Sequence, residues 1–204
     1  MTQPPPPGSL RRRSLLRAIG VAALRVLPAT GAAGALTGFA ERAAAVEPEL
    51  TNFEVTRDED GVHLGYAVDF DLGHGVEDAL MKSVPLFFVA EAEIFRDRWY
   101  WRDRRVANAV HTFRIVFQPL TSTYRITSVG GLSQNYSVRT EALFAISRAT
   151  QWKIAEPGQI EEGSRHYVEF RYRLDTTQLP RPMQIGISGE PDWQLSVKRT
   201  QRIN

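Results

Sequence analysis

Two carboxylates, Asp97 and Asp103, lie close together in the segment RDRWYWRDRR, residues 96–105. Hydrolysis of a glycosidic bond needs two carboxyl groups several ångströms apart, one of which has a raised pKa. Both aspartates have arginine neighbours in the sequence, and a nearby cation lowers the pKa of a carboxyl group. The segment therefore predicts salt bridges rather than a catalytic pair, and we expect each of its charges to have a local partner.

The same segment contains three consecutive aromatic residues between two arginines. Such rings could form an exposed platform that stacks a sugar ring or an extended peptide. Alternatively, one face of the tryptophan pair could complete the hydrophobic core while the arginines stack on the rest, and the residues favour this second interpretation. The candidate binding surface of the first interpretation consists of Arg98, Trp99, Tyr100, Trp101, Arg102 and Asp103.

The histidines are too far apart in the sequence to predict a metal site. None of the four lies two or four positions from another, so a metal site would require convergence from distant strands. The chain has no cysteine and no phosphate-binding or dinucleotide-binding glycine motif. We therefore expect no metal, no cofactor and no catalytic residue, and a binding protein is expected rather than an enzyme. The histidines are His63, His74, His111 and His166.

Alternating patterns predict the strands that must position the aromatic segment. Residues 86–95 alternate with the two glutamates on one side, and residues 106–117 form a second run. The clearest hairpin pairs residues 50–56 with residues 62–70, where every second side chain is apolar. Residues 166–174 alternate in the same way, with a charged outer face. A period of two is typical of half-buried strands.

The remaining pattern completes a mainly β fold. Short helices are expected at residues 76–83 and 139–149, with Trp152 and Ile154 closing the core side of the second. The last two strands are expected to contain residues 183–187 and 193–197. About 7–9 strands with one or two short helices predict an antiparallel β-sandwich of the immunoglobulin-like kind.

The N-terminal 45 residues have the layout of an export signal. A basic region with Arg11, Arg12 and Arg13 precedes a weakly apolar run and a small-residue segment, Ala43-Ala44-Ala45. The segment RRSLLR, residues 12–17, resembles a twin-arginine signal, although general secretion is also compatible. The apolar run is too short for a spanning helix, so no permanent membrane anchor is expected. Residues 46–204 would then form one periplasmic domain.

The charge of the chain also changes when this segment is set aside. The full chain carries a formal net charge of +2 from 25 basic and 23 acidic side chains. Six of the basic side chains and one of the acidic ones lie in residues 1–45. The remaining residues have 19 basic and 22 acidic side chains. This excess of acid argues against a nucleic-acid partner.

The order of motifs in the chain resembles that of the DUF4390 family of exported proteobacterial proteins. The motifs include PLFF, RWYWRDRRVANAVHTFRI, YRIT, TEAL, RYRLDTTQLPRPMQI and DWQLS, and the resemblance spans roughly residues 50–197, nearly all of the chain after residue 45. The resemblance implies an envelope protein of unknown activity that is often encoded near a membrane sensor kinase. We therefore expect a binding or signal-relay module that acts with an envelope protein. A glycan-binding or glycan-cleaving protein that uses Trp99 and Trp101 is the alternative.

Overall fold

The computed structural model describes residues 47–100, 102–128, 130–161 and 163–203. The predicted export signal, residues 1–45, and Trp101 lie outside the described residues. The strands are β1 (Glu49–Asp58), β2 (Gly61–Asp69), β3 (Leu86–Arg96), β4 (Arg104–Gln118), β5 (Thr123–Ser128), β6 (Ser133–Tyr136), β7 (Arg148–Ala155), β8 (His166–Leu174) and β9 (Ser196–Ile203). The helices are α1 (His74–Met81), α2 (Arg139–Ile146) and α3 (Arg181–Gly186), with short 3₁₀ turns η1 (Thr176–Gln178) and η2 (Pro191–Trp193).

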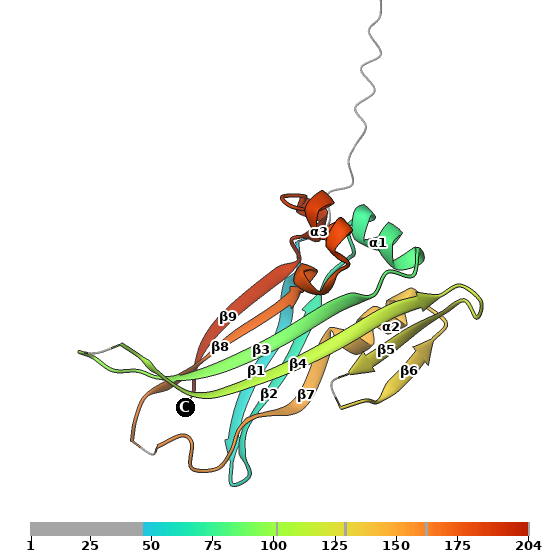
Figure 1. The fold of residues 1–204 in the computed structure, drawn as a ribbon. Helices are drawn as coiled ribbons and strands as arrows, with labels where there is room; N and C mark the ends of the chain where they lie inside the picture. Colours follow the sequence, from blue (N-terminus) through green and yellow to red (C-terminus); the bar gives the residue numbers. More distant parts are fainter. Residues whose placement is uncertain (1–46, 101, 129, 162, 204) are drawn as a thin grey trace, which may run out of the picture. The chain divides into compact units, whose positions relative to one another are not determined.

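The strands form two antiparallel sheets that pack face to face (Figure 1). One has three strands in the order β1-β2-β7, and the other has six in the order β6-β5-β4-β3-β8-β9. Figure 1 shows the three-stranded sheet behind the six-stranded one. The predicted mainly β, antiparallel sandwich is confirmed, and the described residues contain nine strands.

Aromatic rings fill the space between the sheets. Tyr66 in β2 lies 4.8 Å from Phe170 and 6.2 Å from Tyr172, both in β8, measured between ring centroids. Phe70 packs on Phe88 of β3 at 5.4 Å. Burying side chains of this size contributes about 1.5–3 kcal/mol each, which makes these pairs the main attachment between the layers.

The alternating patterns correctly predict which side chains of β2 and β8 are buried, whereas in β4 Val110 of the predicted apolar run is 49% exposed. In β2, Val62, Leu64, Tyr66 and Val68 are at most 2% exposed, and Phe70, directly after the strand, is 7% exposed. The inward set of β8, from His166 to Leu174, is buried in the same way. Period-two placement therefore fixes both the register and the buried face of these strands.

The segment after β8 differs from the sequence-based expectation. Residues 181–186 form helix α3 rather than a strand, and Trp193 lies in η2, so only one strand, β9, follows. The backbone N–H of Met183 donates to the carbonyl of Pro180 at 2.9 Å, which begins the helical turn. Met183 and Ile187 are half-buried and Ile185 is 83% exposed, a pattern that also fits helical spacing.

The second predicted helix also ends earlier than expected. Helix α2 stops at Ile146, and Trp152 and Ile154 belong to strand β7, which pairs with β2. Ser147 ends the helix through a hydrogen bond from its N–H to the carbonyl of Leu143 at 3.0 Å. The chain therefore has one more strand and one shorter helix here than the pattern suggested.

Helix α1 is fixed by a residue near the end of the chain. The carboxylate of Asp192 accepts a hydrogen bond from the backbone N–H of Gly75 at 3.1 Å, in the first turn of α1. Gly73 lies so close to this residue that a Cβ atom added to it would be 2.7 Å from the Cβ of Asp192. The glycine is therefore required by close packing.

Candidate functional site: the tip of the β3–β4 hairpin

The aromatic segment forms the end of a long hairpin that runs along the middle of the six-stranded sheet. Strand β3 pairs with β4 as far as Arg96 and Arg104, and with β8 as far as Arg96 and His166. Residues 97–100 and 102–103, which we call the hairpin tip, lie beyond these last pairs. Figure 1 shows this hairpin extending past the neighbouring strands.

Three hydrogen bonds hold the hairpin tip in place. The backbone N–H of Asp97 donates to the carbonyl of Arg165 at 2.9 Å. One carboxylate oxygen of Asp103 accepts from the backbone N–H of Arg98 at 3.1 Å, and the other accepts from the hydroxyl of Tyr167 at 2.7 Å. The tip is thereby attached both to itself and to the start of β8.

These contacts keep Asp103 ionised. The hydrogen bond from Tyr167 and then that from the Arg98 N–H lower the pKa of the Asp103 carboxyl below its ordinary value. Burial, together with the hydrogen bond to Asp103, raises the pKa of Tyr167. A carboxyl with a lowered pKa is unsuited to donate a proton, so the geometry assigns Asp103 a structural role.

The aromatic rings of the hairpin tip lie on the surface. Trp99 is 87% exposed and Tyr100 is 74% exposed, and their rings are edge to face with centroids 5.0 Å apart. The expectation that the tryptophan pair completes the core is therefore wrong for Trp99. The core below the tip is already filled, since Ile94 and Val168 are both fully buried. Trp101 lies outside the described residues.

Arginines lie within the hairpin tip and around its base. Arg96 forms a salt bridge with Glu161 at 2.7 Å, and Arg105 forms one with Glu93 in β3. The expectation that the charges of residues 96–105 pair locally is wrong, because the partner of Arg96 comes from the loop after β7. Among the described residues, no carboxylate lies within 4.0 Å of the guanidinium nitrogens of four further arginines. These four, which we call the arginine collar, are Arg98, Arg102, Arg104 and Arg165.

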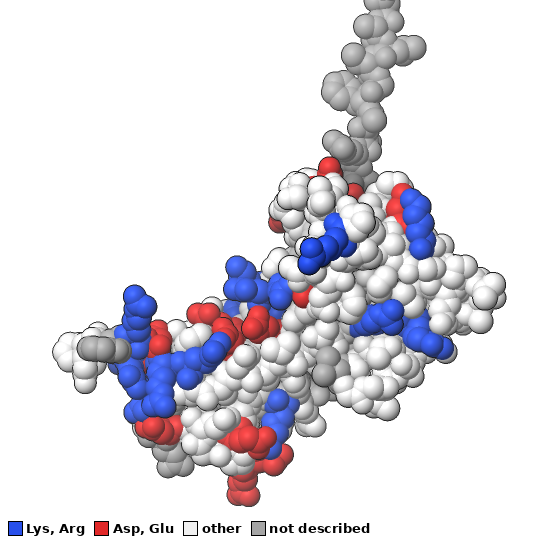
Figure 2. Space-filling model, viewed as in Figure 1, with Lys and Arg blue, Asp and Glu red and all other residues white. Residues whose placement is uncertain are grey.

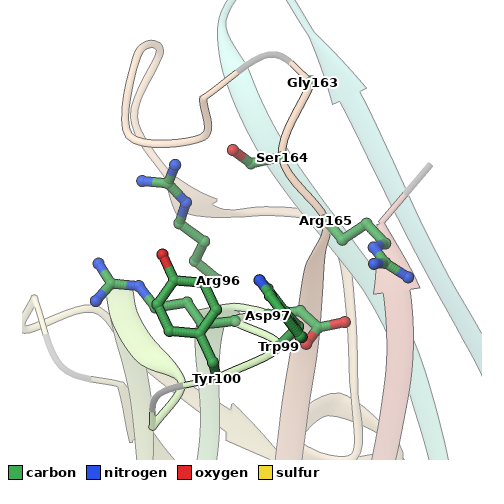
Figure 3. A pocket seen from close by; sticks show the side chains of 8 residues that line it. Arg96, Asp97, Trp99, Tyr100, Gly163, Ser164 and Arg165 are labelled. Atoms are coloured by element: carbon green, nitrogen blue, oxygen red, sulfur yellow. The ribbon is translucent and has the colours of Figure 1, made fainter.

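A hollow of about 600 Å³ lies beside the hairpin tip. It is lined by residues 96–100 of the hairpin and residues 163–165 of the loop before β8. Figure 3 shows the side chains of Arg96, Trp99, Tyr100 and Arg165 around this open space. The hollow therefore combines guanidinium groups and aromatic faces, a set of groups that suits anionic or ring-shaped partners.

The histidines occupy separate positions. His111 in β4 stacks on Trp152 at 5.5 Å between ring centroids, and His166 is 3% exposed with its Nδ1 atom 3.1 Å from the carbonyl oxygen of Ser164. Burial lowers the pKa of both imidazoles. Within the described residues, no three or more His, Asp or Glu side chains lie close enough together to hold a metal ion.

Sequence reasoning identified the tip but missed the residues that hold it. Tyr167 and Arg165 lie more than 60 positions from Asp103 and Asp97, and no local pattern connects them. The only available signal was the alternation in residues 166–174, which places Tyr167 on the outer face of β8.

No helix within the described ranges is both long enough and apolar enough to cross a membrane. A search of the curated proteins and a search of the solved structures returned no match to the chain. A scan against family models matched residues 45–203 to DUF4390, described as a domain of unknown function. The match covers well over half of the chain, including every strand that the structure describes and the hairpin tip, and the chain therefore belongs to the DUF4390 family.

Proposed function

We propose that this protein is an exported, non-catalytic binding or signal-relay module of the cell envelope. It acts with an envelope protein. A membrane sensor kinase is the first candidate partner, because members of the DUF4390 family are often encoded near one. The hairpin tip, together with the arginine collar, is the surface through which it binds. The export signal predicted in residues 1–45 supports a periplasmic location.

The observation that carries this proposal is the exposure of Trp99 and Tyr100 on a fixed support. Large aromatic side chains usually contribute to a core or an interface, and Trp, Tyr and Arg dominate the energetics of binding surfaces. In this protein the Trp99 side chain is 87% exposed and the Tyr100 side chain is 74% exposed, while the hydrogen bond between Tyr167 and Asp103 holds the backbone beneath them. A fixed loop loses little conformational freedom when it binds, which favours affinity.

A photo-crosslinking experiment in the producing cells tests this proposal. Benzoylphenylalanine is introduced at Tyr100, and in a matched control at Leu120, which is 102% exposed in the turn between β4 and β5. We expect an adduct with one envelope protein from position 100 and none from position 120. Equal labelling from both positions, or no protein adduct from position 100, would contradict a protein partner at the hairpin tip.

A glycan ligand is the second candidate, and the hollow beside the hairpin tip favours it. Its lining contains the Trp99 ring, which could stack on a sugar, and the polar side chains of Asp97 and Ser164. Sedimentation of the protein with isolated cell-wall glycan tests this function. Glycan-dependent sedimentation that Trp99→Ala abolishes and Leu120→Ala does not would favour a glycan over a protein partner.

A further inference from the structure

The hairpin tip ends in a polarised arrangement of side chains. Trp99 and Tyr100 lie beyond the last cross-strand pair, Arg96 with Arg104. Of the arginine collar, Arg104 and Arg165 lie at the base of the tip, and Arg98 and Arg102 flank the aromatic residues in the sequence. Figure 2 shows blue Lys and Arg atoms gathered in a band behind the uncharged end of this hairpin. The order from the end inward is therefore aromatic and then cationic.

This order matches the layers of an anionic bilayer surface. Tryptophan and tyrosine are enriched at the level of the lipid headgroups because their rings are apolar and their N–H or O–H groups are polar. Arginine binds phosphate oxygens through two parallel hydrogen bonds, and each basic residue near an anionic leaflet strengthens attachment. If the aromatic rings enter the bilayer surface first, they reach the headgroup level, and the guanidinium groups that follow them reach the lipid phosphates.

We infer that the hairpin tip attaches the protein reversibly to anionic lipid headgroups. The inference rests on the proposed function, in which the tip is the binding surface. It extends that function by naming the lipid around a membrane-embedded partner as a direct contact of the tip. Two rings and four arginines provide a peripheral contact, far weaker than a spanning helix.

The ring geometry favours lipid headgroups over a flat ligand. The planes of Trp99 and Tyr100 meet at 87°, so the two rings do not form one continuous stacking platform for a sugar. A headgroup layer imposes no common plane on the rings that enter it. The guanidinium groups of the arginine collar have no carboxylate within 4.0 Å among the described residues, which leaves them available to phosphate.

Because the chain has no cysteine, single labelling sites can be introduced cleanly. We would attach an environment-sensitive fluorophore to Tyr100→Cys or to Leu120→Cys in the full chain. The probe is a vesicle of phosphatidylglycerol and phosphatidylethanolamine, with phosphatidylcholine vesicles as the neutral comparison. We expect a blue shift from position 100 on anionic vesicles only, and none from position 120. Because both variants carry the same N-terminal segment, the difference between them reports on the hairpin tip.

The arginine collar is tested in the same assay. Arg98→Gln with Arg104→Gln keeps the backbone hydrogen bond of Arg98 and removes two guanidinium groups from the collar. We expect the partition coefficient on anionic vesicles to fall by roughly fivefold for each arginine. Arg181→Gln, at an exposed arginine of α3, is the matched control and is expected to have no effect.

Three outcomes would overturn the lipid inference. These are equal shifts from both labelled positions, binding that ignores lipid charge, and no shift from position 100. If position 100 shows no shift with vesicles but forms a specific protein adduct in cells, the hairpin tip binds protein and the proposed function stands without the lipid contact. If vesicles shift position 100 and no protein adduct forms, the lipid contact stands and the protein partner does not.

Discussion

Tyr167 in β8 donates a hydrogen bond of 2.7 Å to Asp103, which lies 64 positions earlier in the chain, at the end of the hairpin tip. The same carboxylate accepts the backbone N–H of Arg98, on the other side of the tip. One side chain therefore connects both sides of the loop to the neighbouring strand. This connection explains how two exposed rings can have a fixed position without packing into the core.

The first prediction concerns this connection. Tyr167→Phe removes the hydroxyl that contributes most to the lowered pKa of Asp103, so the pKa of that carboxyl should rise towards its ordinary value. The backbone amide of Arg98 should exchange with solvent faster, because the loop is less restrained. NMR titration and hydrogen exchange measure the two effects. Tyr136→Phe, which removes the hydroxyl bonded to Gln134, is the control, and an equal effect there would contradict the assignment.

The second prediction separates exposed from buried tryptophan. Trp99→Ala should change the free energy of unfolding by no more than about 0.5 kcal/mol, because the side chain is 87% exposed. Trp193→Ala should cost about 3–5 kcal/mol, since Trp193 is 8% exposed and packs against α1. Chemical denaturation of both variants provides the test. Strong destabilisation by Trp99→Ala would mean that the ring packs into the core.

Long alternating runs made most of the sheet predictable from the sequence. Four successive inward residues in β2, with Phe70 directly after it, and five in β8 define the period, because a one-residue slip would expose every one of them. A run of only three apolar residues does not distinguish a strand from a helix. Met183, Ile185 and Ile187 fit a strand, but Met183 and Ile187 also lie one helical turn apart, and the turn bonded to Pro180 gives a helix.

The candidate site was only partly predictable for a different reason. The run from Arg98 to Asp103 is visible in the sequence, but whether Trp99 is buried depends on what else fills the core at that level. Ile94 and Val168, from strands 74 positions apart, already fill it. Likewise, Arg96 pairs with Glu161 and not with Asp97, because the loop before β8 brings the glutamate alongside. Such choices depend on tertiary packing, which local patterns do not contain.

The third prediction tests the register of β2. Val68 is 2% exposed, and Val68→Asp would place an unpaired carboxylate between the sheets, at a cost of about 3 kcal/mol or more. Asp69 is the next residue and is exposed, so Asp69→Ala should be mild. Thermal melts rank the two variants. The opposite ranking would show that the buried face of β2 is the other one.

A fourth prediction concerns the close contact between Gly73 and Asp192. A Cβ at position 73 would lie 2.7 Å from the Cβ of Asp192, so Gly73→Ala must move η2 or α1. We expect a loss of about 1–3 kcal/mol in the free energy of unfolding. Gly186→Ala, at the end of α3, is the control, because a Cβ added there would have no neighbouring atom within 4 Å. This change should be neutral or slightly stabilising. Equal effects of the two changes would argue against the contact.

The last prediction is a loss of stability in mild acid that depends on His111. Burial lowers the pKa of His111 in the folded protein, whereas the unfolded chain takes up the proton at the ordinary value of about 6.5. Stability is therefore fully present above pH 6.5 and falls as the pH drops below it, because the unfolded state binds more protons. His111→Phe keeps a ring stacked on Trp152 and should reduce the fall measured by urea denaturation between pH 7 and pH 5, leaving the share due to His166. An unchanged slope in His111→Phe would assign the effect elsewhere.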